Sequence, residues 1–135
     1  MSVLGLALSL HVIVAILGCG LVSGLLIVAL NMDGSEPAAT WVALDRIRRT
    51  VGVSLGVVLA SGVLLEYLAG GPFHGTIWFR TSFFLLLVVG ALNGVAGRAI
   101  RKKTAATAPA VVRLVRAAAS AMCAVVATLM ELKPW

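Results

Sequence analysis

The sequence predicts an all-α protein: a bundle of four transmembrane helices that forms a single integral membrane domain over residues 1–135. Hydrophobic residues make up 61% of the chain and charged residues 12%, against about 45–50% and about 25% in a soluble domain. The apolar residues also form runs of about 18 or more, which is long enough to cross a hydrocarbon core of ~30 Å as a helix. These runs lack the alternating pattern of a transmembrane β-barrel.

The expected spans cover residues 3–30, 51–70, 76–97 and 110–130. The segments between them, "NMDGSEPAATWVALDRIRRT", "GGPFHG" and "RAIRKKTAATAP", contain the glycine, proline and charge that a span avoids. The first run has no basic segment before it and is longer than the apolar core of a signal peptide. We therefore expect the first run to be a permanent span.

The connection between the first two spans contains a helical stripe of apolar residues. The stripe consists of Trp41, Leu44, Ile47 and Val51. Ser35 precedes it as a possible N-cap, and Pro37 would fall in the first turn, where proline is tolerated. This pattern predicts a short interfacial helix between spans one and two.

The distribution of positive charge predicts the orientation. Nine of the eleven Lys and Arg residues fall in the first connection, the third connection or the start of span four: Arg46, Arg48, Arg49, Arg98, Arg101, Lys102, Lys103, Arg113 and Arg116. Because basic residues favour the cytoplasmic side, both termini should lie on the non-cytoplasmic side of a bacterial inner membrane. This topology and attraction to anionic lipids account for the net charge of +6, so no nucleic-acid partner is expected.

Pairs of glycines four residues apart recur on three spans. They are Gly20 with Gly24, Gly52 with Gly56, and Gly90 with Gly94. Small residues at this spacing let helix backbones approach closely in a membrane. The pairs predict tight helix packing, and self-association or contact with other membrane proteins through glycine-rich helix faces.

The polar residues of the spans are expected to gather in the outer half of the bundle. They are His11, Glu66, His74, Arg80, Glu131 and Lys133. Ionisable groups cost several kcal/mol in hydrocarbon unless they are paired, so they usually face protein. Simpler roles remain open: Arg80, Glu131 and Lys133 could anchor helix ends, and Glu66 could neutralise a neighbouring cation. The inner half should hold basic residues only at its rim, with Asn93 as an interhelical hydrogen-bond donor.

His11 has three possible roles. It could hydrogen-bond a neighbouring helix, serve as an axial ligand of haem b, or bind a metal ion or relay a proton with Glu66 as its partner. A haem held by two histidines would require His74 to fold down from its loop. The haem propionates would then find Arg80 and Lys133 at the outer surface. No Cys or His spacing typical of a zinc site is present.

The two cysteines, Cys19 and Cys123, should both lie near the middle of the membrane, on spans one and four. A thiol in this position usually fills space as a small apolar group. A disulfide or a soft-metal pair is the alternative if the two spans touch.

Four short motifs resemble the small CopD-like integral membrane proteins: "LHVIVAILGCG", "SGVLLEYLAG", "WFR" and "LMELKPW". A similar four-helix pattern occurs in the haem-binding membrane protoporphyrinogen oxidases. The resemblance implies a four-helix fold, His11 as the candidate ligand and Lys133 as the lysine of the terminal motif. The chain departs from the pattern at Gly18, Cys19 and Gly20, and has Arg80 where the family has a lysine.

Two classes of function follow. The first is a bundle that binds haem b or a metal near its outer face, with His11, His74, Glu66, Arg80 and Lys133 as candidate binding residues, and serves redox or metal handling. The second is a non-catalytic accessory or structural subunit that docks to a larger membrane complex. The sequence contains no catalytic constellation, and no span has the broken centre or acidic pair expected of an ion path.

Overall fold

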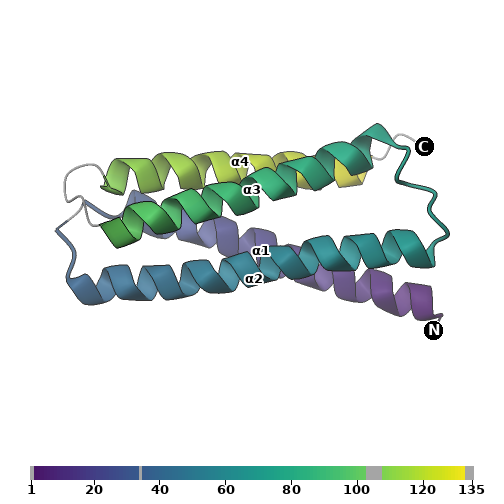
Figure 1. The fold of residues 1–135 in the computed structure, drawn as a ribbon, viewed down its shortest axis with the longest axis horizontal. Helices are drawn as coiled ribbons and strands as arrows, with labels where there is room; N and C mark the ends of the chain where they lie inside the picture. Colours follow the sequence, from purple (N-terminus) through teal and green to yellow (C-terminus); the bar gives the residue numbers. More distant parts are fainter. Residues whose placement is uncertain (1, 34, 103–107, 133–135) are drawn as a thin grey trace.

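The computed structural model describes residues 2–33, 35–102 and 108–132, and it consists of four long helices (Figure 1). The helices are α1 (Val3–Leu30), α2 (Ala38–Leu68), α3 (Ile77–Lys102) and α4 (Ala108–Leu132). Each is long and apolar enough to cross a membrane. The structure thus confirms an all-helical fold with four candidate membrane spans.

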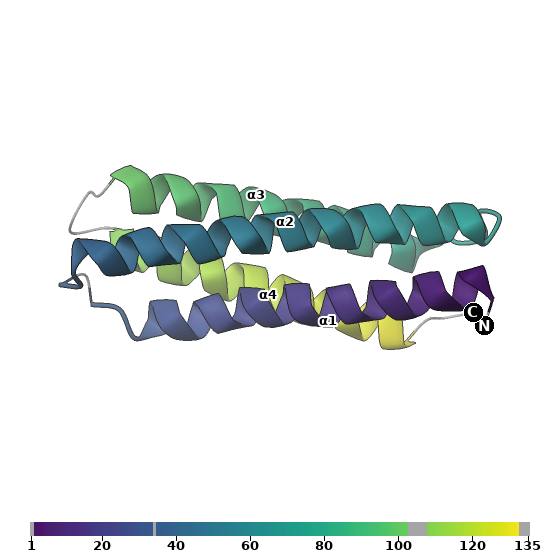
Figure 2. The same cartoon turned by 90° about the horizontal axis from the view of Figure 1, so that it is seen from below.

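The helices form a ring in which each packs against two neighbours. The pairs in contact are α1 with α2, α2 with α3, α3 with α4, and α4 with α1, and no contact joins diagonal helices in the described chain. The start of α1, the end of α4 and the connection from α2 to α3 lie at one end of the bundle, which we call the terminal end (Figure 2). The connection from α1 to α2 lies at the opposite end, here called the far end.

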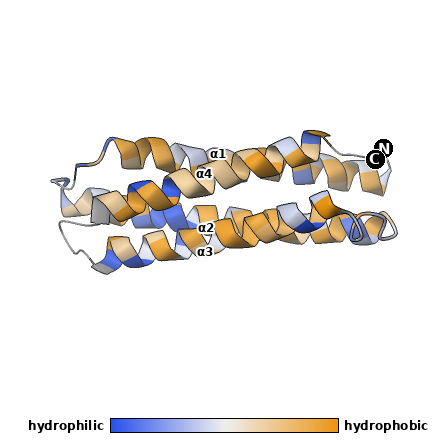
Figure 3. Ribbon diagram, turned by 90° about the horizontal axis from the view of Figure 1, so that it is seen from above, coloured by the Kyte–Doolittle hydropathy of each residue, from blue (hydrophilic) through white to orange (hydrophobic). Residues whose placement is uncertain are grey.

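The buried core is apolar in the middle of the bundle, and the outward faces are apolar as well. Val22, Val51 and Val89 are almost completely enclosed. Only 17–33% of the residues in each apolar window are buried, however, so most apolar side chains point outward. Figure 3 shows the apolar colouring running along all four helices, with hydrophilic residues near both ends of the bundle. Such surfaces suit helices that lipid surrounds.

The segment expected to form an interfacial helix is instead the first part of α2. Residues 38–68 form one continuous helix, so the described chain contains no separate helix between the first two spans. Pro37 occupies the N-cap position, and Ser35 bonds Asp33 through its amide and its hydroxyl, at 2.8 and 2.6 Å. These bonds hold the pKa of Asp33 below its usual range.

The physical reason for the continuous helix is that one buried stripe runs through it. Leu44, Arg48, Val51, Leu55 and Val58 are buried at helical spacing, and all face the other helices. The helix ends at Leu68 with Ala69 as its C-cap, and the next two residues, Gly70 and Gly71, adopt positive φ angles of 84° and 78°. Glycine accepts this left-handed conformation without strain, which starts the turn towards α3.

The predicted glycine pairs mostly do not mediate packing inside the bundle. A Cβ atom would meet nothing within 4 Å at five of the six positions: Gly20, Gly24, Gly56, Gly90 and Gly94. Other glycines lie at the close contacts: Gly18 beside Val58, Gly62 beside His11, and Gly97 beside Arg48. The prediction of tight packing within the bundle at these pairs was therefore wrong for all except Gly52, and contact with partners through the open faces stays a prediction.

Candidate functional site

His11 lies on α1 at the contact with α2. Its Nδ1 atom is 2.7 Å from the Ser61 hydroxyl, and that hydroxyl donates its proton to the carbonyl oxygen of Val58 at 3.0 Å. With its one proton directed to Val58, the Ser61 oxygen can accept a hydrogen bond from Nδ1–H of His11. In the neutral imidazole of this tautomer, Nε2 carries the lone pair. Gly62 leaves room for the ring, since a Cβ there would lie 3.4 Å from Cε1 of His11.

Glu66 organises the connection between α2 and α3. Its side chain is 12% exposed, and Oε1 accepts hydrogen bonds from the backbone amides of Phe73 at 3.0 Å and His74 at 2.7 Å. The Nδ1 atom of His74 lies 3.2 Å from the same oxygen. Arg80 donates from Nε to the carbonyl oxygen of His74 at 2.8 Å. The carboxylate therefore accepts hydrogen bonds from backbone amides that the turn would otherwise leave without partners.

The structure thus brings Glu66, His74 and Arg80 together but records no contact between any of them and His11. In the described chain no ion pair joins Glu66 to Arg80, and the His74 side chain is 73% exposed on its loop. Glu131 is exposed near the end of α4. Lys133, the fifth predicted binding residue, lies outside the described residues.

Metal-ligating groups do not gather anywhere in the described ranges, which contain no cluster of three or more His, Cys, Asp or Glu side chains able to hold an ion. Cys19 and Cys123 are both free thiols. They lie within hydrogen-bonding reach of each other where α1 packs against α4. Spans one and four are therefore in contact at the cysteines, which is the condition for a disulfide or a soft-metal pair.

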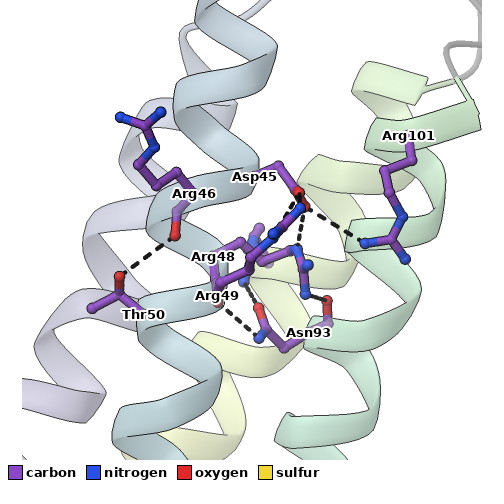
Figure 4. A network of polar contacts seen from close by, with 8 residues as sticks. Asp45, Arg46, Arg48, Arg49, Thr50, Asn93 and Arg101 are labelled. Atoms are coloured by element: carbon purple, nitrogen blue, oxygen red, sulfur yellow. Dashed lines mark hydrogen bonds and ion pairs between the residues drawn. The ribbon is translucent and has the colours of Figure 1, made fainter.

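A second group of polar side chains lies near the far end, and we call it the arginine cluster. It comprises Asp45, Arg48, Arg49, Asn93, Arg101 and Arg116. Asp45 accepts from Arg48 Nε at 2.8 Å and from Arg49 Nη2 at 2.8 Å, and Arg101 Nη1 lies 3.8 Å away (Figure 4). Three guanidinium groups from α2 and α3 therefore share one buried carboxylate.

Asn93 links three helices within this cluster. Its Nδ2 donates to the carbonyl oxygen of Arg48 on α2 at 3.1 Å, and its Oδ1 accepts from Arg116 Nη1 on α4 at 2.9 Å. Arg116 is only 1% exposed, and its Nε and Nη2 atoms have no hydrogen-bond partner. Arg48 is 9% exposed and repels Arg116 electrostatically. Two permanently charged groups are thus enclosed with a single acid between the helices.

The sequence analysis placed the basic residues of the inner half at its rim, and the structure adds that two of them, Arg48 and Arg116, are enclosed by the bundle. The expectation that Asn93 donates a hydrogen bond between helices was confirmed. A sequence signal did exist: Arg116 occupies the same stripe as Val112, Ala119 and Cys123, all of them buried.

Comparison with protein families, with curated proteins and with solved structures finds no significant match to this chain. The resemblance to CopD-like membrane proteins therefore stays a prediction.

Proposed function

We propose that this protein is a small multi-pass membrane protein that binds haem b through His11 and serves redox chemistry at the terminal end of the bundle. The observation that supports the proposal is the bond from Nδ1 of His11 to Ser61. Ligating histidines usually donate their second ring nitrogen to a nearby acceptor, which fixes the tautomer and leaves the other nitrogen for the metal. Haem, when bound, supplies one-electron redox chemistry.

Haem fits the donor set better than a bare metal ion does. A bound ion needs several ligands, and the described residues contain no cluster of three His, Cys, Asp or Glu groups. Haem iron needs only one axial ligand from the chain, as in haem proteins with a single proximal histidine. His11 is half-buried, so part of the residue is exposed at the surface of the α1–α2 pair.

His74 is not proposed as the second axial ligand. Its ring already contacts Glu66, and its backbone is bound to the same carboxylate. Arg80 lies on the same side and is a partner for a propionate, with Lys133 implied by the family resemblance alone. In this arrangement Glu66 keeps the loop in place and does not touch the cofactor.

The test is the absorption spectrum of the purified protein, oxidised and then reduced, with and without added haemin. We expect a Soret band that shifts on reduction, bound iron near one per chain, and loss of both in His11→Ala. His74→Ala is the matched control and should keep the spectrum. A colourless protein after haemin addition, or a spectrum unchanged in His11→Ala, would overturn the proposal.

A non-catalytic accessory subunit is the second candidate function, and the outward-facing glycines favour it. Gly20 and Gly24 of α1 and Gly90 and Gly94 of α3 have open space where a Cβ would be. Such positions allow another helix to approach closely. This function predicts a haem-free protein whose stability is unaffected by Gly20→Leu, while that substitution disrupts its assembly in the native membrane.

A further inference from the structure

The arginine cluster has more positive charge than its described partners neutralise. Its one carboxylate, on Asp45, is already shared by three guanidinium groups. Arg116 receives only the amide oxygen of Asn93 and keeps two nitrogen atoms without partners. Arginine does not lose its proton in proteins, so this charge persists at every physiological pH. The far end of the bundle therefore attracts an anion.

A groove beside Asp45 gives such an anion a place to bind. Its volume is about 340 Å³, and it lies between α2 and α3. The lining residues are Trp41, Val42, Asp45, Arg46, Arg49, Ile100 and Arg101. Arg49 and Arg101 approach Asp45 from two different helices, and their side chains are 69% and 54% exposed (Figure 4). Among the described residues, both keep N–H groups without a partner, in the planar fork that matches phosphate oxygens.

We propose that this groove binds the phosphate of an anionic phospholipid. Three features favour a lipid over a soluble ion. The groove lies near the ends of membrane-spanning helices, its wall includes the apolar Val42 and Ile100, and Trp41 is the residue type that prefers the interface. Basic pockets between transmembrane helices bind anionic head groups on the cytoplasmic side. The site is at the opposite end from His11 and does not depend on haem.

Trp41 provides a direct probe. Trp78→Phe and Trp135→Phe leave Trp41 as the single tryptophan, and the protein is reconstituted in vesicles containing phosphatidylglycerol or phosphatidylcholine with brominated acyl chains. Bromine quenches tryptophan only at close range. We expect stronger quenching by the brominated phosphatidylglycerol at equal mole fraction, with a binding preference of roughly fivefold for each arginine that contacts the head group.

Arg49→Gln with Arg101→Gln should abolish the preference. The matched control is Arg98→Gln with Arg113→Gln, which removes the same charge from exposed positions outside the groove lining. Equal quenching by both lipids, or equal loss of preference in the two double variants, would overturn the site. A response of Trp41 to inorganic phosphate in detergent, without any lipid preference in vesicles, would identify a soluble phosphate and overturn the lipid assignment.

Discussion

Replacing Gly97 with alanine tests whether the buried arginine is held as tightly as its contacts indicate. A Cβ at this position of α3 would lie 2.5 Å from Cζ, 2.6 Å from Nε and 2.9 Å from Nη1 of Arg48. A long side chain on a surface would move aside at little cost. Arg48 is 9% exposed and is bound to Asp45 at 2.8 Å, so it can move only by breaking that bond or by shifting the helices.

The magnitude follows from two losses and one small gain. Forcing an extra methyl group into a packed interior costs about 1–3 kcal/mol. Losing a buried hydrogen bond between charged groups costs about 1.5–3 kcal/mol more. Alanine regains up to about 1 kcal/mol over glycine through its higher helix propensity. The free energy of unfolding of Gly97→Ala should therefore fall by about 1.5–6 kcal/mol.

The assay is loss of helicity on titration with a denaturing detergent, in which both variants start from the same folded micellar state. Gly94→Ala is the control: it lies one turn away on the same helix, where nothing is within 4 Å of a Cβ. We expect this variant to be as stable as the unsubstituted protein, or slightly more so. If Gly97→Ala unfolds at the same detergent concentration as Gly94→Ala, Arg48 is not fixed at this contact and the description of the cluster is wrong.

Three further substitutions test other contacts. Asn93→Ala removes the one described acceptor of Arg116 and should lower the free energy of unfolding by about 3–5 kcal/mol, because a buried charge loses its partner; an unchanged detergent titration would contradict this. Glu66→Gln weakens the hydrogen bonds from two loop amides to this side chain, at a cost of about 1–2 kcal/mol. Those amides should then exchange hydrogen roughly 5–30 times faster, as measured by hydrogen exchange with mass spectrometry. Ser61→Ala frees Nδ1 of His11, so haem affinity should fall about 10–100-fold in a haemin titration while the helicity stays constant; affinity equal to that of the unsubstituted protein would refute the assigned tautomer.

Most of the fold could be predicted because the length of an apolar run is a direct physical requirement of the bilayer. The first span was predicted at residues 3–30, and α1 covers Val3–Leu30. The start of α2 was harder, because residues 38–50 contain charges that a hydropathy argument places outside a span. In the structure the same charges lie on a helix that begins at Ala38, which puts Asp45 about two turns and Arg48 almost three turns inside it.

The early start of α2 also explains why the arginine cluster could not be predicted. Counting basic residues by loop says only that Arg48 and Arg116 lie near helix ends, whereas their burial depends on where each helix begins and which face turns inward. The glycine pairs failed for a related reason, since spacing shows that two residues share a face but not which face packs inside. At the terminal end, distance along the chain correctly placed Glu66 beside its loop. The same distance could not show that the Glu66 carboxylate would accept hydrogen bonds from backbone amides.

The ring of helices starts and finishes at the same end of the bundle. If all four helices cross the membrane, the number of crossings is even, and we expect reporters fused ahead of α1 and behind α4 to share one aqueous compartment. Two copies joined in tandem by a linker would likewise insert with the same polarity. An alkaline phosphatase fusion at either end should then report on the same face of the membrane.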